Sequence, residues 1–177
     1  MRTALTILMT VLPLAAIAAG SDSTAPPKPS QTTTQCTKAQ IWDEKTRTCV
    51  DAKSGNLTDD DRFRAVRELA WADRPEEALV VLEAMAEGDT DRVLTYKGFA
   101  HRKAGRIAEG SDNYERALVA NPDNILARSY YGQMLVQLSR MDAANAQLTQ
   151  IRARGGIGSW AEISLANAIV SGKTYSY

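Results

Sequence analysis

Cys36, Cys49 and the sole histidine, His101, are the first candidates in this sequence for catalytic or metal-binding chemistry. The two cysteines could form a disulfide, or a cysteine beside the histidine could act as a nucleophile. However, His101 lies far along the chain from both cysteines, and no second pair of metal ligands accompanies them. We therefore expect no catalytic residue and no metal site, and we interpret His101 as a packing or surface residue.

Two further patterns have the composition of ligand-binding motifs. The acids Asp59-Asp60-Asp61 could hold a cation, but acidic residues also stabilise the first turn of a helix. Gly155-Gly156-Ile157-Gly158 follows a predicted helix, whereas a phosphate-binding loop follows a strand and opens a helix. We interpret the acids as a helix start and the glycines as a loop. The sequence therefore predicts no cofactor and no enzyme.

The charges of the chain balance, with 21 lysine and arginine residues and 21 acidic residues. A nucleic-acid partner would require a clustered basic excess, so we expect none. The length of 177 residues suits one domain of ordinary size with attached segments.

Residues 1–19 have the pattern of a signal peptide. They begin with Met1-Arg2 and continue as an uncharged, mostly apolar run that ends in the small-x-small pattern Ala16-Ile17-Ala18. The run is short for a membrane span, which needs about 20 residues. We predict cleavage near Ala18 or Ala19, export to the periplasm or outside the cell, and no membrane insertion after cleavage. An uncut membrane anchor is the alternative.

Residues 20–35 are rich in proline and threonine and contain no apolar residue that could anchor a core. Such a composition favours an extended backbone without packed structure. We predict a disordered linker here.

Residues 36–57 are predicted to form a small hairpin and a connector. Ile41-Trp42 and Thr46–Val50 have the composition of two short strands around a turn. A hairpin of this size is marginal alone. A Cys36–Cys49 disulfide would close a loop of about 14 residues and contribute about 3 kcal/mol. Oxidising compartments outside the cytosol permit this bond, so we predict it.

Trp42 lies between the two cysteines and gives the hairpin a second interpretation. Cys36, Ile41-Trp42-Asp43 and Cys49 are similar to part of a small chitin-binding module, in which an aromatic ring beside a disulfide hairpin stacks on sugar. Those modules contain more cysteines than this chain has. Trp42 is therefore a candidate for glycan stacking, and the alternative is that it covers the disulfide or docks on the first helices.

From residue 58 onward the apolar residues follow a helical period. Gly98 and Gly132, Tyr114 and Leu148, and Leu135 and Ile169 match at one fixed spacing. This spacing of about 34 residues is typical of stacked helix–turn–helix units. Before residue 92 the interval is two residues shorter. The first predicted helix is capped by Thr58 or Asp59 and carries an apolar face from Phe63 to Ala70, and its partner starts at Arg74-Pro75 and is ended by Gly88-Asp89. The other predicted helices are 92–104, 107–120, 125–138, 141–152 and a closing helix over 160–170.

The stretch 92–123 resembles a tetratricopeptide repeat. The residues that carry the resemblance are Gly98 in the first helix, Gly105 in the turn, Tyr114 and Ala117 in the second helix, and the terminal Pro122. The next repeat keeps Tyr131-Gly132, Ala144 and Leu148 but has Gly156 where the proline stands. Further departures are Lys97, His101 and Gly110.

The resemblance implies an all-α solenoid of about three repeats and a closing helix over residues 58–172, with a tail over 173–177. In that architecture Gly98 and Gly132 let the two helices of one unit approach closely. The order of signal, disulfide hairpin and repeats looks like that of exported bacterial tetratricopeptide proteins.

The register of the family also implies a concave groove, lined by the first helix of each pair. The groove positions are Phe63, Arg67, Trp71, Arg92, Thr95, Phe99, Arg102, Lys103, Ser129, Gln133, Val136 and Gln137. Arginines and aromatic rings together suit an acidic or C-terminal peptide. The asparagines and lysines of a carboxylate clamp are missing, so clamp-type binding is disfavoured. A solvated helix face with Phe99 partly in the core is the alternative.

The leading hypothesis is thus an exported adaptor or scaffold whose groove binds a protein or peptide of the cell envelope. The rival is a cell-envelope glycan-binding protein that acts through Trp42. The sequence leaves the oligomeric state open.

Overall fold

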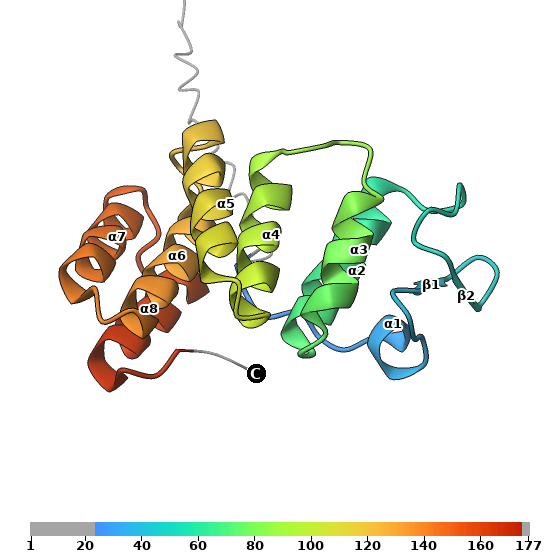
Figure 1. Cartoon of the computed structure of the whole chain (residues 1–177), viewed down its shortest axis with the longest axis horizontal. Helices are drawn as coiled ribbons and strands as arrows, with labels where there is room; N and C mark the ends of the chain where they lie inside the picture. The colour runs from blue at the N-terminus through green and yellow to red at the C-terminus, as the bar shows by residue number, and fades with distance from the viewer. Residues whose placement is uncertain (1–23, 175–177) are drawn as a thin grey trace, which may run out of the picture.

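The computed structural model describes residues 24–174 (Figure 1). The predicted signal peptide and its cleavage site lie outside the described residues, as do residues 175–177. Among residues 24–174, no helix combines the length and the apolar character that a membrane crossing requires.

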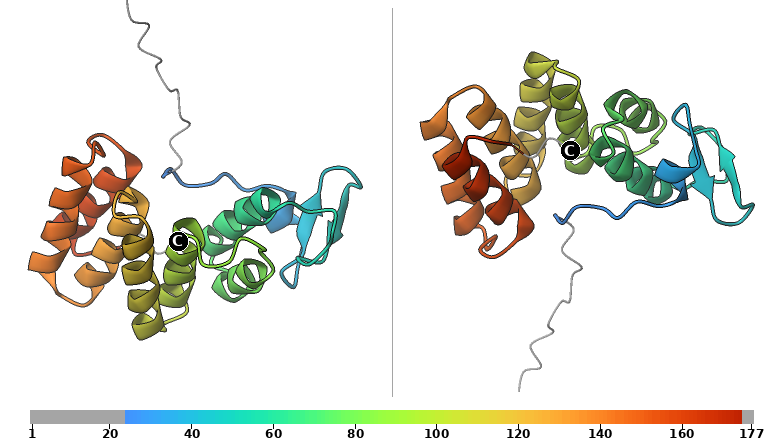
Figure 2. Two further views of the ribbon diagram at one scale, coloured as in Figure 1. Left: turned by 90° about the horizontal axis from the view of Figure 1, so that it is seen from above. Right: turned by 90° about the horizontal axis from the view of Figure 1, so that it is seen from below.

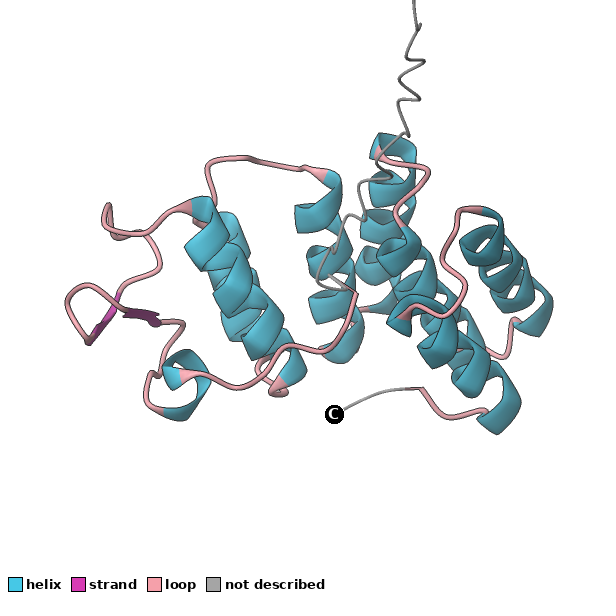
Figure 3. Cartoon of the chain, turned by 180° about the vertical axis from the view of Figure 1, so that it is seen from behind, coloured by secondary structure: helices cyan, strands magenta, loops and turns pink. Residues whose placement is uncertain are grey.

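The described part of the chain is mostly helical, and three helix pairs stand side by side (Figures 1 and 3). The hairpin lies beside the first pair, and the last helix packs against both helices of the third pair. The elements are α1 (Gln31–Thr34), β1 (Ile41–Asp43), β2 (Thr48–Val50), α2 (Asp59–Trp71), α3 (Pro75–Glu83), α4 (Asp91–Lys103), α5 (Ile107–Ala120), α6 (Ile125–Gln137), α7 (Met141–Ala153) and α8 (Trp160–Ser171).

The helices reproduce the spacing of the sequence. The second and third pairs keep the full period, both from the start of α4 to the start of α6 and from the start of α5 to the start of α7. The step from the start of α2 to the start of α4 is shorter by two positions. The shortening lies in α3, which has 9 residues where α5 has 14, and the longer loop over 84–90, compared with 121–124, restores part of the difference.

Local signals fix where several helices begin. The Thr58 hydroxyl accepts from the Asp61 backbone N–H, and the Asp61 carboxylate accepts from the Thr58 backbone, which completes a capping box for α2. The Asp61 carboxylate also accepts from the Thr58 hydroxyl at 2.6 Å, and this bond, followed by that from the Thr58 backbone N–H, lowers the pKa of Asp61. The acids predicted to open a helix therefore do so.

Close approach of helices depends on two glycines. A Cβ atom at Gly98 of α4 would lie 2.6 Å from the Tyr114 ring of α5, within the same pair, as predicted. At Gly132 of α6 the nearest atoms belong to Leu165 of α8, also at 2.6 Å. Gly132 thus permits a close approach of α8 to α6, a contact that the sequence did not predict, besides the packing of α6 on α7.

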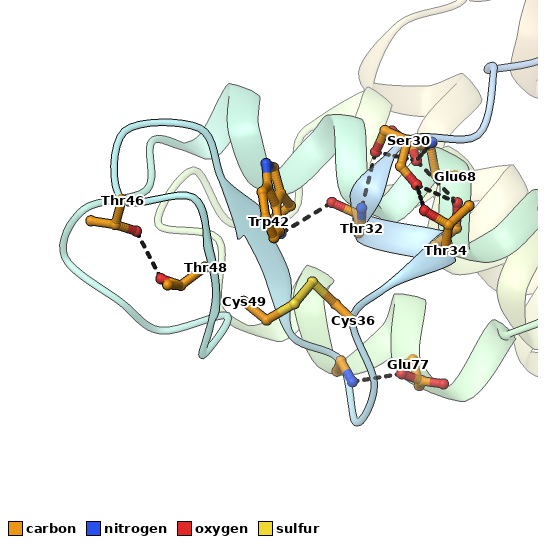
Figure 4. Close-up of a disulfide and its surroundings, with 12 residues drawn as sticks. Ser30, Thr32, Thr34, Cys36, Trp42, Thr46, Thr48, Cys49, Glu68 and Glu77 are labelled. Carbon is orange, nitrogen blue, oxygen red and sulfur yellow. Dashed lines mark hydrogen bonds between the residues drawn. A yellow bond between two sulfur atoms is a disulfide. The ribbon is translucent and has the colours of Figure 1, made fainter.

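The predicted disulfide is confirmed. Cys36 and Cys49 are bonded with a Cα–Cα distance of 5.6 Å, and the antiparallel strands pair Trp42 with Cys49 (Figure 4). Strand β2 begins at Thr48, two residues later than predicted, because Thr46 belongs to the turn. There the Asp43 carboxylate accepts from the Lys45 backbone N–H and the Thr46 hydroxyl, and the Lys45 bond is the main cause of the lowered pKa of Asp43.

The prediction of a disordered linker is wrong for residues 24–35, which pack on α2 and include α1. Polar contacts replace the missing apolar anchors. The Glu68 carboxylate accepts from the Ser30 backbone N–H at 2.9 Å and from the Ser30 hydroxyl at 2.7 Å (Figure 4). Arg74 donates to the carbonyls of Thr33 and Cys36.

The hairpin is held to α3 by Glu77. Its carboxylate accepts from the Ala39 backbone N–H at 2.6 Å and from the Arg74 guanidinium, and the Arg74 bond is the main cause of the lowered pKa of Glu77. The hairpin thus has attachments to the helices besides its disulfide.

Replacing both cysteines by serine should loosen residues 36–50 while the helix pairs keep their stability. The disulfide closes a separation of 13 residues, and loss of that constraint removes about 3 kcal/mol from the hairpin alone. Hydrogen exchange by mass spectrometry should show faster exchange confined to this segment. A large fall in the melting temperature of the helices would contradict this.

Candidate functional site

The inner sides of α2, α4 and α6 form one continuous surface, which we call the face. The face carries the half-buried residues Phe63, Arg67, Trp71, Arg92 and Leu126. Each of these helices is the first helix of its pair. Helix α4 contacts both α2 and α6, so the three helices are direct neighbours. The family register predicted this surface, but the structure places the predicted groove residues at very different depths.

Several predicted groove residues lie in the interior, which corrects their assignment to an accessible groove. Thr95, Phe99 and Gln133 are 1% exposed, Arg102 5% and Val136 6%, and Ser129 is fully buried. On α6 the cause is α8: the hydroxyls of Ser129 and Ser164 lie 3.0 Å apart, and Gln133 Nε2 lies 3.4 Å from the Ser164 hydroxyl. The closing helix therefore covers the positions that a third repeat would present.

Phe99 is the centre of an aromatic cluster. Its ring centroid lies 4.6 Å from that of Tyr130 and 6.1 Å from those of Trp71 and Tyr96. The Arg102 guanidinium lies 5.3 Å from the Phe99 centroid and donates to Gln137. Phe99 thus joins α2, α4 and α6 as a core residue, as the alternative interpretation held.

The predicted cations are already bound within the chain. Arg92 pairs with Glu87 and with Asp60, each at 2.8 Å, and Lys103 pairs with Asp73 at 2.9 Å. These carboxylates neutralise Arg92 and Lys103, whereas Arg67 and Arg102 donate to neutral oxygens of Tyr96, Ala25 and Gln137. Gln137 is exposed at the C-terminal end of α6.

A pocket of about 430 Å³ lies on the face, at the N-terminal ends of α4 and α6. Its lining includes the predicted residues Phe63, Arg92 and Thr95, together with Leu126 and Asn124. The Arg92 guanidinium lies 4.7 Å from the Phe63 ring centroid. We call this cavity the main pocket.

One wall of the main pocket is a polar network that the sequence analysis missed. The Asp91 carboxylate accepts from the side-chain amides of Asn121 at 2.7 Å and Asn124 at 2.9 Å. Asn124 also caps α6 by accepting from the Ala127 backbone N–H. The helix-start pattern around Pro122 could have indicated the cap, but contact with Asp91 depends on how α4 and α6 pack.

Residues 24–30, which we call the strap, run along the face, with a turn and a bend at residues 24 and 25 and no regular secondary structure over 26–30 (Figures 2 and 3). Arg67 Nη2 donates to the Ala25 carbonyl at 2.6 Å. Pro27, Pro29 and Trp71 line a cavity of about 140 Å³, and the buried Thr24 lines the main pocket. The face therefore has a stretch of this chain bound to it.

A second cavity, the hairpin cavity, has a volume of about 250 Å³ and lies between the hairpin and α2. Trp42, Asp61, Arg64 and Glu68 are among its lining residues. The indole N–H of Trp42 is buried and has no acceptor among the described residues. The Trp42 ring therefore lies beside a polar cavity, and its N–H has no acceptor among the residues that the structure describes.

His101 is part of an ion-pair network. Its Nδ1 atom accepts from Arg106 Nε at 2.9 Å, and Arg106 pairs with Glu76 at 2.7 Å. Burial is the main cause of the lowered pKa of His101, and the neighbouring Arg106 adds to it.

Comparison with protein-family models, with curated proteins and with solved structures found no match for this chain.

Proposed function

We propose that this chain is an exported adaptor or scaffold of the tetratricopeptide-repeat type, acting in the periplasm or outside the cell. Its face would bind an extended segment of a cell-envelope protein. The strap is the observation that carries this proposal: an extended backbone already lies on the face, with a carbonyl bound by Arg67. The repeat spacing and the signal-like residues 1–19 also support it.

The face would recognise the partner segment by a hydrogen bond to its backbone and by a pocket for one of its side chains. Arg67 supplies a charged donor for a backbone carbonyl, and the main pocket offers Phe63 and Leu126 to an apolar or small side chain. An acidic ligand is less suited than the sequence suggested, because Arg92 and Lys103 are paired within the chain. Extended main-chain binding with a side-chain pocket is a common mode of peptide recognition.

A photo-reactive amino acid at Leu126 should cross-link an envelope protein, because this residue lines the main pocket. The matched control is the same amino acid at Val119 of α5, which is 83% exposed and lies outside the face. Equal cross-linking from both positions would contradict the proposal that the face binds the partner.

With a peptide from the cross-linked partner, Arg67→Ala should weaken binding about tenfold or more, since a hydrogen bond from a charged group contributes about 1.5–3 kcal/mol. Isothermal titration calorimetry would measure this. Arg64→Ala is the matched control, because Arg64 is 68% exposed in its side chain and lies on the hairpin side of the same helix. Equal losses in the two variants would contradict the role of Arg67.

Glycan binding is the second candidate, and the unpaired indole N–H of Trp42 in the hairpin cavity favours it. Sugars present both ring faces for stacking and hydroxyls for hydrogen bonds, which suits Trp42 beside Asp61 and Glu68. Trp42→Phe keeps an aromatic ring but removes the donor. If this candidate holds, the variant should pellet less with insoluble peptidoglycan than wild type or Trp160→Phe. Equal pelleting would eliminate it.

A further inference from the structure

We propose that the strap is an internal competitor: the partner is an extended, proline-containing segment that occupies the same part of the face and must displace residues 24–29. This inference rests on the proposed function, and it adds the chemistry of the partner and a condition for its binding.

The composition of the strap suits binding to the face with few backbone hydrogen bonds. Pro26, Pro27 and Pro29 have no backbone N–H, so these positions cannot donate hydrogen bonds to the face. Proline also favours the extended polyproline conformation before binding, which lowers the entropy lost on docking. The face supplies an aromatic ring and a hydrogen-bond donor to the strap. Trp71 lines the same cavity as Pro27 and Pro29, and Arg67 donates to the Ala25 carbonyl.

The downstream end of the strap is anchored to α2. Ser30 is fixed by two hydrogen bonds to Glu68, at 2.9 and 2.7 Å, and α1 and the disulfide follow it in the chain. Upstream of Ser30, Arg67 binds the Ala25 carbonyl, Pro27 and Pro29 line one cavity with Trp71, and the buried Thr24 lies at the main pocket. A partner that displaces the strap has to replace these upstream contacts, while the bonds of Ser30 keep the hairpin module attached.

The strap leaves the main pocket open. Thr24 reaches its lining, and a volume of about 430 Å³ remains beside Phe63 and Leu126. A partner with a larger apolar side chain at the position of Thr24 would bury more surface than the strap does. This difference is what would allow an external segment to displace an internal one.

Attachment at Ser30 gives the strap an effective concentration of about 1 mM on the face. A free copy of the same segment that binds the empty face with a dissociation constant of about 0.1 mM would then bind the wild type about tenfold more weakly.

The test uses the chain after signal removal, in wild-type form and with residues 24–29 replaced by a glycine–serine stretch of equal length. Ser30, α1 and both cysteines stay, and matching far-ultraviolet circular dichroism spectra verify that the helices are formed. The probe is a fluorescein-labelled peptide with the sequence of residues 24–30, followed by fluorescence anisotropy. It should bind the glycine–serine variant, and wild type about tenfold more weakly. A peptide with Thr24→Leu should bind the variant more tightly, and a peptide with its prolines replaced by glycine should not bind.

Equal binding of the peptide to both proteins, or binding to neither, would overturn the proposal. So would unchanged binding when Trp71→Ala is added to the glycine–serine variant. These outcomes separate the inference from the proposed function. If Leu126 cross-links an envelope protein equally in both proteins and the peptide binds neither, the adaptor function is supported and the competing strap is contradicted. If the peptide competes with the strap but Leu126 cross-links no envelope protein, the contact of the strap with the face is supported and the proposed envelope partner is contradicted.

Discussion

Replacing Phe99 by alanine should lower the free energy of unfolding by about 3–5 kcal/mol. The side chain is 1% exposed, and its ring lies against Tyr130 of α6, Trp71 of α2 and Tyr96 of its own helix. Alanine would leave a cavity among three rings that cannot easily collapse, because they belong to three packed helices. Since the cluster joins the helix pairs, the loss should be global. Urea unfolding followed by far-ultraviolet circular dichroism would measure it.

Two controls separate the core from the surface of the same face. Phe99→Leu keeps most of the volume and should cost less than Phe99→Ala. Phe63→Ala removes a half-buried ring at the edge of the main pocket and should also cost less. A Phe99→Ala protein that keeps its stability would contradict the core assignment and return Phe99 to the set of groove candidates.

Replacing Gly98 by alanine should destabilise the protein by about 2 kcal/mol, although alanine is the better helix former. Alanine gains about 1 kcal/mol from helix propensity. Its Cβ atom, however, would lie 2.6 Å from the Tyr114 ring, which is fully buried between α4 and α5. Overpacking of this kind costs about 1–3 kcal/mol, and a rigid ring puts the cost at the upper end. Gly98→Leu should cost more, because the two helices would have to separate.

The contact between Gly98 and Tyr114 can be isolated with a double-mutant cycle. In a Tyr114→Leu background the ring is gone, so the added cost of Gly98→Ala should shrink or change sign. Gly55→Ala is the matched glycine control, because no atom lies within 4 Å of its added Cβ, and its effect should stay within about 0.5 kcal/mol. Additive effects of Gly98→Ala and Tyr114→Leu would contradict the close approach.

The sequence predicted the helices well because their signals are local. The repeat spacing, the capping residues around Thr58 and Pro75 at the first position of α3 are each visible in the order of the residues alone. The disulfide was equally accessible, since two cysteines allow one intramolecular pair and residues 1–19 have the pattern of a signal peptide. These features need no knowledge of how the helices pack.

The site was harder to predict because it depends on what covers the face. Ser129 and Gln133 have the register of groove residues, and only the position of α8 places Ser164 beside them. Composition alone marked residues 24–35 as disordered. Their order comes from Glu68 and Arg74, which bind partners at a sequence separation of 38. Long-range polar contacts of this kind leave no periodic signal.

The place of the strap also sets an order of assembly. The Cys36–Cys49 bond spans 13 residues and can close as soon as this short stretch has been made. The contact between Ala25 and Arg67 spans 42 residues, and the surface around it needs α2, α4 and α6 to have packed. The strap is thus translated before the helices on which it lies, and the surface that receives it is complete only when α2, α4 and α6 have packed.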